Sequence, residues 1–150
     1  MNYWIFKCNP KRYNIDLRLA RNTEDQITWS ANQYEKEIAA GDIAFIWRTG
    51  RKWGIYAVMQ IEESPRKRAD LESERRYYLD YDVGECMRVL GRLTHRLKGI
   101  HAKELKNTPG LENLSALYGF RQGTNFRVTP EEGRILMSLI EQAEHPDSRQ

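Results

Sequence analysis

Two apolar runs joined by a short polar loop constrain the fold of this 150-residue chain most strongly. Residues 43–48 are mainly apolar on both faces, which is typical of a buried strand, and residues 55–61 form a second such run. The loop between them, residues 49–54, is short enough to join the two runs as antiparallel neighbours. The sequence therefore predicts a β-hairpin that contributes buried strands to a sheet.

Three further segments have strand character. Residues 3–7 are aromatic and β-branched, and this strand should end before Pro10 because proline cannot donate to a sheet ladder. Residues 77–83 alternate between aromatic and acidic side chains, which predicts a half-exposed strand. Residues 87–97 predict another strand, whereas the charged residues 66–74 predict a loop.

Residues 11–21 fit two patterns. Ile15 and Leu19 share one face of a helix, yet Ile15, Leu17 and Leu19 also alternate as they would in a strand. Periodicity leaves both structures open, and we favour a short helix.

Capping residues predict a second helix. Asn32 and Glu35 have the spacing of a capping box, and Gly41 stands where a left-handed residue would end the helix. The sequence therefore predicts a helix over residues 33–39.

The C-terminal part of the chain ends in a clearer helix signal. Thr129, Pro130 and Glu132 form a capping box with proline at the first helical position. Residues 103–106 and parts of 111–117 predict shorter helical pieces before it. The apolar stripe of the C-terminal helix would consist of Ile135, Leu136, Leu139, Ile140 and Ala143.

Length and element order define the expected architecture. Strands with short helices between them and no regular βαβ alternation predict an α+β fold with a mixed or barrel-like sheet. The length favours one domain, residues 1–143, followed by a flexible tail over residues 144–150. No apolar run approaches the roughly 18 residues of a membrane span and the first residues lack the features of a signal peptide, so we expect a cytoplasmic protein without membrane contact.

Charge and cysteine content narrow the function classes. The net charge of +3 is mildly basic, but residues 65–68 are basic without an acid and residues 92–106 hold five Lys/Arg against one acid, whereas the last twenty residues are mainly acidic. This asymmetry gives a polyanion one preferred face. Cys8 and Cys86 lack metal-ligand spacing, so we expect two half-buried thiols, no disulfide, no metal and no cofactor.

Three tryptophans lie in polar settings near turns: Trp29, Trp47 and Trp53. Core packing is the usual explanation for a tryptophan. A base lifted out of its stack needs flat apolar surfaces on its faces and polar groups at its edge, and an indole beside Ser30 or Asn32 supplies both.

Basic side chains near these tryptophans could hold the phosphates that flank such a base, although a solvated surface is an equally ordinary role for them. The candidate phosphate-binding residues are Arg48, Arg51, Lys52, Arg66, Lys67 and Arg68.

A catalytic alternative rests on four residues. Asp80 and Asp82, followed by Glu104 and Lys106, have the order of a D…ExK metal-dependent nuclease. These residue types are abundant and the order arises often by chance. The histidines have no nucleophile partner, and the sequence contains no GxSxG, P-loop or GxGxxG motif, so we expect no enzymatic activity.

Five segments have the order and spacing of a known family: residues 3–10 (YWIFKCNP), 28–32 (TWSAN), 41–48 (GDIAFIWR), 54–58 (GIYAV) and 123–132 (GTNFRVTPEE). In these segments the chain resembles EVE domains, which belong to the PUA-like superfamily and are related to YTH domains. The resemblance implies a strongly curved mixed sheet, or pseudo-barrel, surrounded by short helices. It also implies non-catalytic capture of a modified base: a methylated or oxidised cytosine in DNA, or a modified RNA base.

The resemblance also assigns site residues. It places Trp29 and Ser30, with Asn32 close behind, in the pocket segment, Asn9 at the pocket edge, and Trp47 in the pocket by its strand motif. The hypothesis requires an opening between the rings of Trp29 and Trp47. Restriction, modification or RNA-processing proteins are the implied protein partners, and a protein-interaction module without nucleic-acid contact is the remaining alternative.

Overall fold

The computed structural model of the protein describes residues 1–21, 24–79, 84–118 and 123–144. Within these residues the strands are β1 Tyr3–Cys8, β2 Gln26–Ser30, β3 Ile43–Arg48, β4 Gly54–Arg68, β5 Cys86–His101 and β6 Asn125–Val128. The six strands form one mixed sheet of order β2-β5-β4-β3-β1-β6. The β1–β3 pair is parallel and the other four pairs are antiparallel. The helices are α1 Ile15–Ala20, α2 Glu72–Arg75, α3 Ala102–Lys106, the 3₁₀ helix η1 Ser115–Leu117 and α4 Pro130–Glu144.

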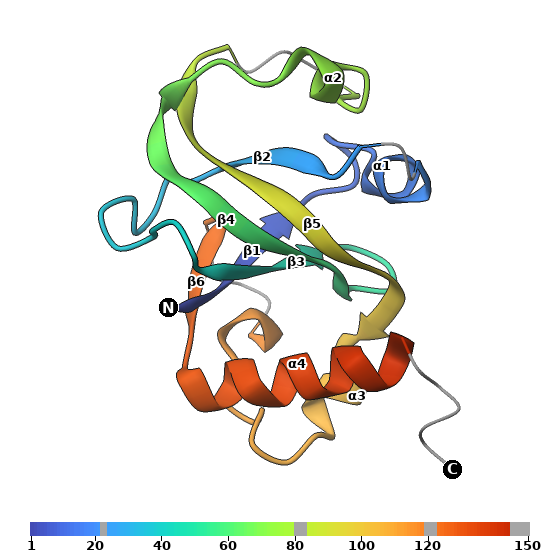
Figure 1. Cartoon of the computed structure of the whole chain (residues 1–150). Helices are drawn as coiled ribbons and strands as arrows, with labels where there is room; N and C mark the ends of the chain where they lie inside the picture. The colour runs from blue at the N-terminus through green and yellow to red at the C-terminus, as the bar shows by residue number, and fades with distance from the viewer. Residues whose placement is uncertain (22–23, 80–83, 119–122, 145–150) are drawn as a thin grey trace.

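The long strands β4 and β5 curve the sheet. They run side by side from the α2 end of the molecule to the α3 end (Figure 1), and their register shifts at several places. Each shift bends the pair and increases its twist. Gly91 lets the two strands pack closely, because a Cβ there would lie 2.5 Å from the Gln60 carbonyl oxygen.

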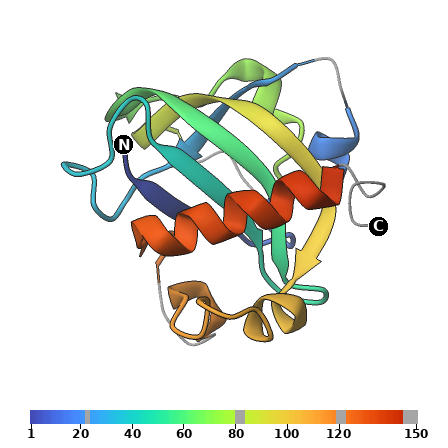
Figure 2. The same ribbon diagram turned by 60° about the horizontal axis from the view of Figure 1, so that its bottom comes forward.

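Each face of the curved sheet buries its own apolar cluster. One cluster contains Trp4, Trp29 and Ile46, and the other contains Phe45 and Trp47 with the apolar side of α4. Helix α4 lies across this second face (Figure 2). Alternation along β3 explains why adjacent residues Ile46 and Trp47 enter different clusters.

The predicted capping box of α4 is confirmed. The Thr129 hydroxyl accepts the Glu132 N–H at 3.1 Å, and the Glu132 carboxylate accepts the Thr129 N–H at 2.9 Å. In the predicted apolar stripe Leu136 and Ile140 are fully buried, whereas Ala143 is exposed.

Most predicted elements are present. The hairpin is β3 and β4, the first strand is β1, residues 11–21 contain α1, and β5 and α3 cover two other predictions. The mixed curved sheet with short helices and a C-terminal helix confirms the predicted α+β fold.

The helix predicted over residues 33–39 is wrong. Tyr34 has a φ of +56°, which no α-helix accommodates, and Glu37 and Ile38 donate to the Tyr34 carbonyl in a turn. The Asn125 side chain binds the N–H groups of Asn32 and Gln33, and the Asn32 N–H is the one that the predicted capping box would pair with Glu35.

Two other predictions need correction. The loop expected over residues 66–74 is instead the end of β4 followed by α2. Residues 77–79 form no strand of the predicted kind: Tyr78 makes one isolated bridge to Tyr13, and residues 80–83 lie outside the described part of the chain.

The short strands β2 and β6, which form the two edges of the sheet, were not predicted from the sequence. The tail predicted over residues 144–150 lies outside the described residues except for Glu144. Among the described residues, no helix combines the length and apolar character that crossing a bilayer would need.

Candidate functional site

The two edge strands of the sheet, β2 and β6, meet through side chains. The Asn125 amide is buried, and its Nδ2 donates to the Ser30 carbonyl at 2.9 Å. Its Oδ1 accepts the N–H groups of Asn32 and Gln33 at 3.0 and 3.2 Å. In return, the Gln33 side-chain oxygen accepts the N–H groups of Thr124 and Asn125 at 2.8 and 3.1 Å. The edges are thus closed into a partial barrel by amide side chains.

The β1–β6 ladder opens next to this closure. Lys7 donates its N–H to the Thr124 carbonyl at 2.7 Å, which extends the pairing by one residue. The second hydrogen bond that an antiparallel pair would have, from the Thr124 N–H to the Lys7 carbonyl, does not form. The Thr124 N–H donates to Gln33 instead, and the Lys7 carbonyl accepts the Trp29 indole N–H at 3.3 Å. The opening leaves room for a pocket between β1 and β2.

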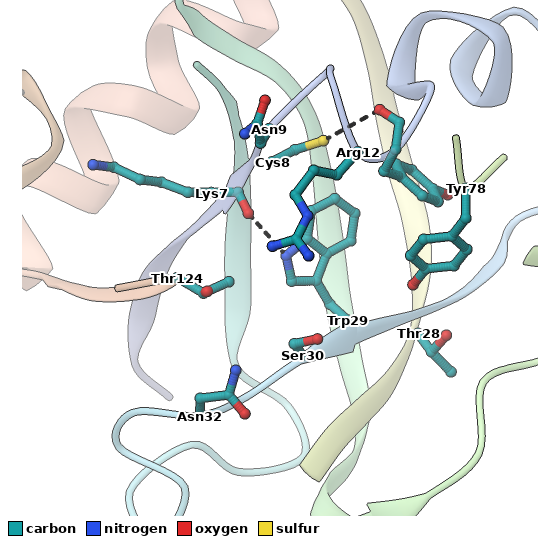
Figure 3. Close-up of a pocket in the computed structure, with 11 residues that line it drawn as sticks. Lys7, Cys8, Asn9, Arg12, Thr28, Trp29, Ser30, Asn32, Tyr78 and Thr124 are labelled. Atoms are coloured by element: carbon teal, nitrogen blue, oxygen red, sulfur yellow. Dashed lines mark hydrogen bonds between the residues drawn. The ribbon is translucent and has the colours of Figure 1, made fainter. Parts of the chain in front are cut away.

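A pocket of about 280 Å³ occupies this opening (Figure 3). It collects residues from the end of β1, the β1–α1 loop, β2 and the segments just before β6 and after α2. Its lining consists of Lys7, Cys8, Asn9, Arg12, Tyr13, Thr28, Trp29, Ser30, Asn32, Tyr78 and Thr124.

Aromatic rings form one wall of the pocket. Trp29 is 9% exposed, and its ring meets Tyr13 edge-on at 5.8 Å between centroids. Tyr13 in turn meets Tyr78 edge-on at 5.1 Å. The hydrogen bond from the Trp29 indole to the Lys7 carbonyl fixes the orientation of the ring, so this wall is formed before any ligand binds.

The open edge of β2 supplies polar main-chain groups. Ala31 donates to the Met87 carbonyl and Leu93 donates to the Asp25 carbonyl, so odd-numbered residues of this segment pair with β5. The N–H and C=O groups of Thr28 and Ser30 therefore point the opposite way, toward the open edge, where the Ser30 carbonyl already accepts the Asn125 amide. Donors and acceptors alternate along such an edge, as they do along the edge of a base.

Buried polar networks hold the aromatic wall from behind. Tyr13 donates to the Glu74 carboxylate, which also binds Arg18 Nε at 2.9 Å, and both Arg18 and Glu74 are about 2% exposed. Burial, with Glu74 acting in the same direction, raises the pKa of Tyr13 well above its ordinary value. The Tyr13 hydroxyl therefore stays protonated and keeps its ring in place.

Cys8 lines the pocket as a neutral thiol. Burial raises the pKa of its thiol to about 12. The reactive thiolate is absent at neutral pH, so the pocket offers Cys8 as an apolar surface.

Four of the five predicted pocket residues lie together. Asn9, Trp29, Ser30 and Asn32 all line this pocket. Trp47 does not: it is fully buried in the other core cluster, where its ring meets Trp53 edge-on at 5.7 Å beside a separate hollow of about 270 Å³. The predicted slot between Trp29 and Trp47 is therefore wrong.

The predicted phosphate-binding residues form two groups. Arg51 and Lys52 are exposed in the β3–β4 loop, which Thr49 ties to the Cys8 carbonyl beside the pocket. Arg48, in contrast, is 18% exposed and binds Asp16 at 3.2 Å.

The second group, residues 66–68, pairs with β5 residues 86–88, and Ser30 pairs with Arg88 from the other side of β5. This group thus lies across one strand from the pocket. Arg66 and Arg68 each have an ion pair with Glu63, at 3.7 and 3.5 Å, which reduces their free positive charge.

Several pocket residues were missed by sequence reasoning. Tyr13 and Tyr78 are far apart in sequence and meet only in the fold, so no local pattern links them. Four of the missed residues, Lys7, Cys8, Thr28 and Thr124, lie inside the segments that resemble the family, and that position was the available signal. Arg12 is the remaining missed lining residue.

The nuclease residues are not assembled in the described part of the structure. Glu104 and Lys106 lie on α3, while Asp80 and Asp82 fall outside the described residues. Among residues that are described, no group of three or more His, Cys, Asp or Glu side chains could hold a metal ion.

The curved mixed sheet with short surrounding helices and a C-terminal helix defines a PUA-like α+β protein. Within this class the family model described as EVE domain matches residues 2–139, and the chain belongs to the EVE domain family. No curated protein matches the chain.

Solved structures share the fold. A protein from Pseudomonas putida has 20% identity and a TM-score of 0.64, with 91% of this chain and 98% of that chain covered. A hypothetical protein from Leishmania major has 15% identity and a TM-score of 0.68, with 96% and 97% covered. Human THYN1, solved in complex with DNA containing 5-methylcytosine, has 18% identity and a TM-score of 0.63, with 94% and 98% covered.

Proposed function

We propose that this protein is a non-catalytic reader that captures one modified base of DNA or RNA, such as a methylated or oxidised cytosine, in the pocket between β1 and β2. The observation that carries the proposal is the position of Trp29, whose oriented ring lines a pocket together with Asn9, Ser30 and Asn32. The membership in the EVE family and the 5-methylcytosine DNA in the THYN1 complex support it.

The pocket has the size and chemistry for one planar ring. Its volume lies near the lower end of the range for ligand pockets, about 300–1000 Å³, which suits a single base better than a larger ligand. Stacking of a base on an aromatic side chain contributes about 1–3 kcal/mol, comparable to the cost of unstacking it. An added methyl group that fills an apolar wall contributes roughly 1–3 kcal/mol more.

Binding without catalysis is consistent with the lining residues. The Cys8 thiol is neutral, and the hydroxyls and amides that surround Trp29 can orient a base without changing it. Arg51 and Lys52 would hold phosphates next to the pocket without reading sequence. Partners among restriction, modification or RNA-processing proteins stay a prediction of the family resemblance, and a cytoplasmic location stays a prediction from the sequence.

Retention of matched oligonucleotides tests the proposal. Single strands of one sequence would carry 5-methylcytosine, 5-hydroxymethylcytosine, a methylated RNA base or the plain base at one position. We expect tighter retention of at least one modified strand, and loss of that difference in Trp29→Ala. Trp53→Ala, which removes an indole outside the pocket, is the matched control and should keep the difference.

The alternatives give other outcomes. Equal retention of all modified and plain strands would contradict a modified-base reader. A protein-interaction module predicts little retention of any strand at low salt. Mass spectrometry of nucleosides enriched from total DNA and RNA by the protein would identify the base without prior choice.

A further inference from the structure

Two hydroxyl groups of the pocket share one buried carboxylate. Thr28 Oγ1 and Tyr78 OH donate to the two different oxygens of Asp70. The Asp70 side chain is 3% exposed, and Arg88 Nε lies 3.7 Å from it. Asp70 also accepts the Leu71 N–H at 2.8 Å, so both of its oxygens are engaged.

This sharing fixes what the hydroxyls can offer a ligand. An ionised carboxylate only accepts hydrogen bonds, so both hydroxyls must donate to Asp70. Each hydroxyl has a single hydrogen, and only its lone pairs remain for the pocket. Burial, with Asp70 acting in the same direction, raises the pKa of Tyr78, so its hydroxyl keeps the proton. Thr28 and Tyr78 therefore present two acceptors to the pocket.

We propose that Asp70 sets the base specificity of the pocket: it holds Thr28 and Tyr78 as acceptors and thereby selects bases with an exocyclic amino group over bases with a carbonyl at the same place. This inference rests on the proposed function. An amino group has two hydrogens for two acceptors, whereas a carbonyl oxygen would face lone pairs and lose its own hydrogen bonds.

The opposite side of the pocket has complementary chemistry. Asn9 lies across Trp29 from Thr28 and Tyr78 (Figure 3). Its Oδ1 accepts the Lys11 N–H at 3.0 Å and keeps one lone pair, while its Nδ2 hydrogens are donors that a ligand carbonyl can bind. A base with an amino group on one side and a carbonyl on the other fits this arrangement.

Matched pairs of bases test the inference. In the first pair of strands the bases are 5-methylcytosine and thymine, which share the methyl group and differ at ring position 4 and in the proton on N3. In the second pair the bases are 5-hydroxymethylcytosine and 5-hydroxymethyluracil, which differ in the same way. We expect the amino member of at least one pair to be retained roughly tenfold better. Thr28→Val and Tyr78→Phe should lower this ratio, because each removes one acceptor.

Controls separate specificity from folding. Thr28→Ser keeps the hydroxyl and should keep the ratio, and so should Thr94→Val, which removes a hydroxyl outside the pocket. Asp70→Asn can donate as well as accept and should bring the ratio toward one. Because Asp70→Asn leaves the buried Arg88 without its carboxylate, the thermal unfolding of this variant is measured as well. If Asp70→Asn does not fold, Thr28→Val and Tyr78→Phe provide the test.

The outcomes are distinguishable. If modified strands are retained better than plain strands but the amino member of neither pair is retained better than the carbonyl member, the proposed specificity is wrong and the proposed function stands. An unchanged ratio in both Thr28→Val and Tyr78→Phe would also overturn it. Equal retention of all modified and plain strands would contradict both the proposed function and this inference.

Discussion

Asn125 and Gln33 each bind the backbone of the segment that carries the other. The Asn125 Oδ1 accepts two N–H groups around Gln33, and the Gln33 Oε1 accepts two N–H groups around Asn125. Main-chain donors that would otherwise lie unpaired at two sheet edges are satisfied by this exchange. The closure beside the pocket therefore depends on two amides from distant parts of the chain.

Loss of either amide should weaken the closure. Asn125→Ala leaves two N–H groups and the Ser30 carbonyl without this partner, so we expect the free energy of unfolding to fall by about 3 kcal/mol. Urea denaturation measures this change. Because Gln33→Ala breaks the same contact between segments, the double variant should cost less than the sum of the two single variants, by at least about 0.5 kcal/mol. Strict additivity would show that the two amides act independently.

The buried Cys8 thiol should make stability fall in alkali. Its folded pKa, about 12, lies above the ordinary value of 9.0, so above pH 9 the unfolded chain releases a proton that the folded protein keeps. The unfolded state then binds fewer protons, and the free energy of unfolding falls as pH rises. Between pH 9 and pH 10 we expect Cys8→Ala to lose roughly 1 kcal/mol less than the parent protein, measured by denaturant unfolding at both pH values. Equal losses would show that Cys8 does not contribute to this pH dependence.

The fold was predictable where local patterns and tertiary bonds agree. The alternation of the β3–β4 hairpin and the capping box at Thr129 both reflect short-range chemistry that the structure keeps. The capping-box prediction failed at Asn32, where the backbone turns left-handed at Tyr34. The Asn125 side chain from the far end of the chain accepts the Asn32 N–H, which the box would pair with Glu35. No pattern within residues 33–39 contains that information.

The site was predictable only around Trp29. Ser30 and Asn32 follow it directly, and the family segments added Asn9. Trp47 was misplaced because a strand that is apolar on both faces does not show which face a given residue takes. Tyr78 could not be found, since it joins the pocket through a bridge to Tyr13 that depends on tertiary packing.

Arg96 should hold the connection between α1 and β2. Its guanidinium donates to the carbonyls of Leu19, Arg21 and Glu24 at 3.1, 2.8 and 2.9 Å. Arg96→Met keeps much of the apolar stem and removes these bonds, so we expect a loss of about 1–3 kcal/mol and faster amide exchange over the end of α1 and the start of β2. Hydrogen exchange with mass spectrometry measures both regions. Unchanged exchange there would show that this connection is held by packing alone.

The β3–β4 loop should contribute affinity without contributing specificity. Arg51 and Lys52 are exposed in the loop that Thr49 joins to the Cys8 carbonyl, and each phosphate contact to a single strand adds about 0.7 to the slope of log affinity against log salt. We expect Arg51→Gln/Lys52→Gln to lower this slope by about 1.4 while the ratio of modified to plain strands stays the same. Arg134→Gln removes one exposed positive charge on α4 and should leave the slope unchanged, as measured by binding between low and physiological salt. If Arg134→Gln lowers the slope as much per charge as the loop variant does, the loop has no special part in binding; if the base ratio changes with Arg51 and Lys52, these residues contact the base rather than its phosphates.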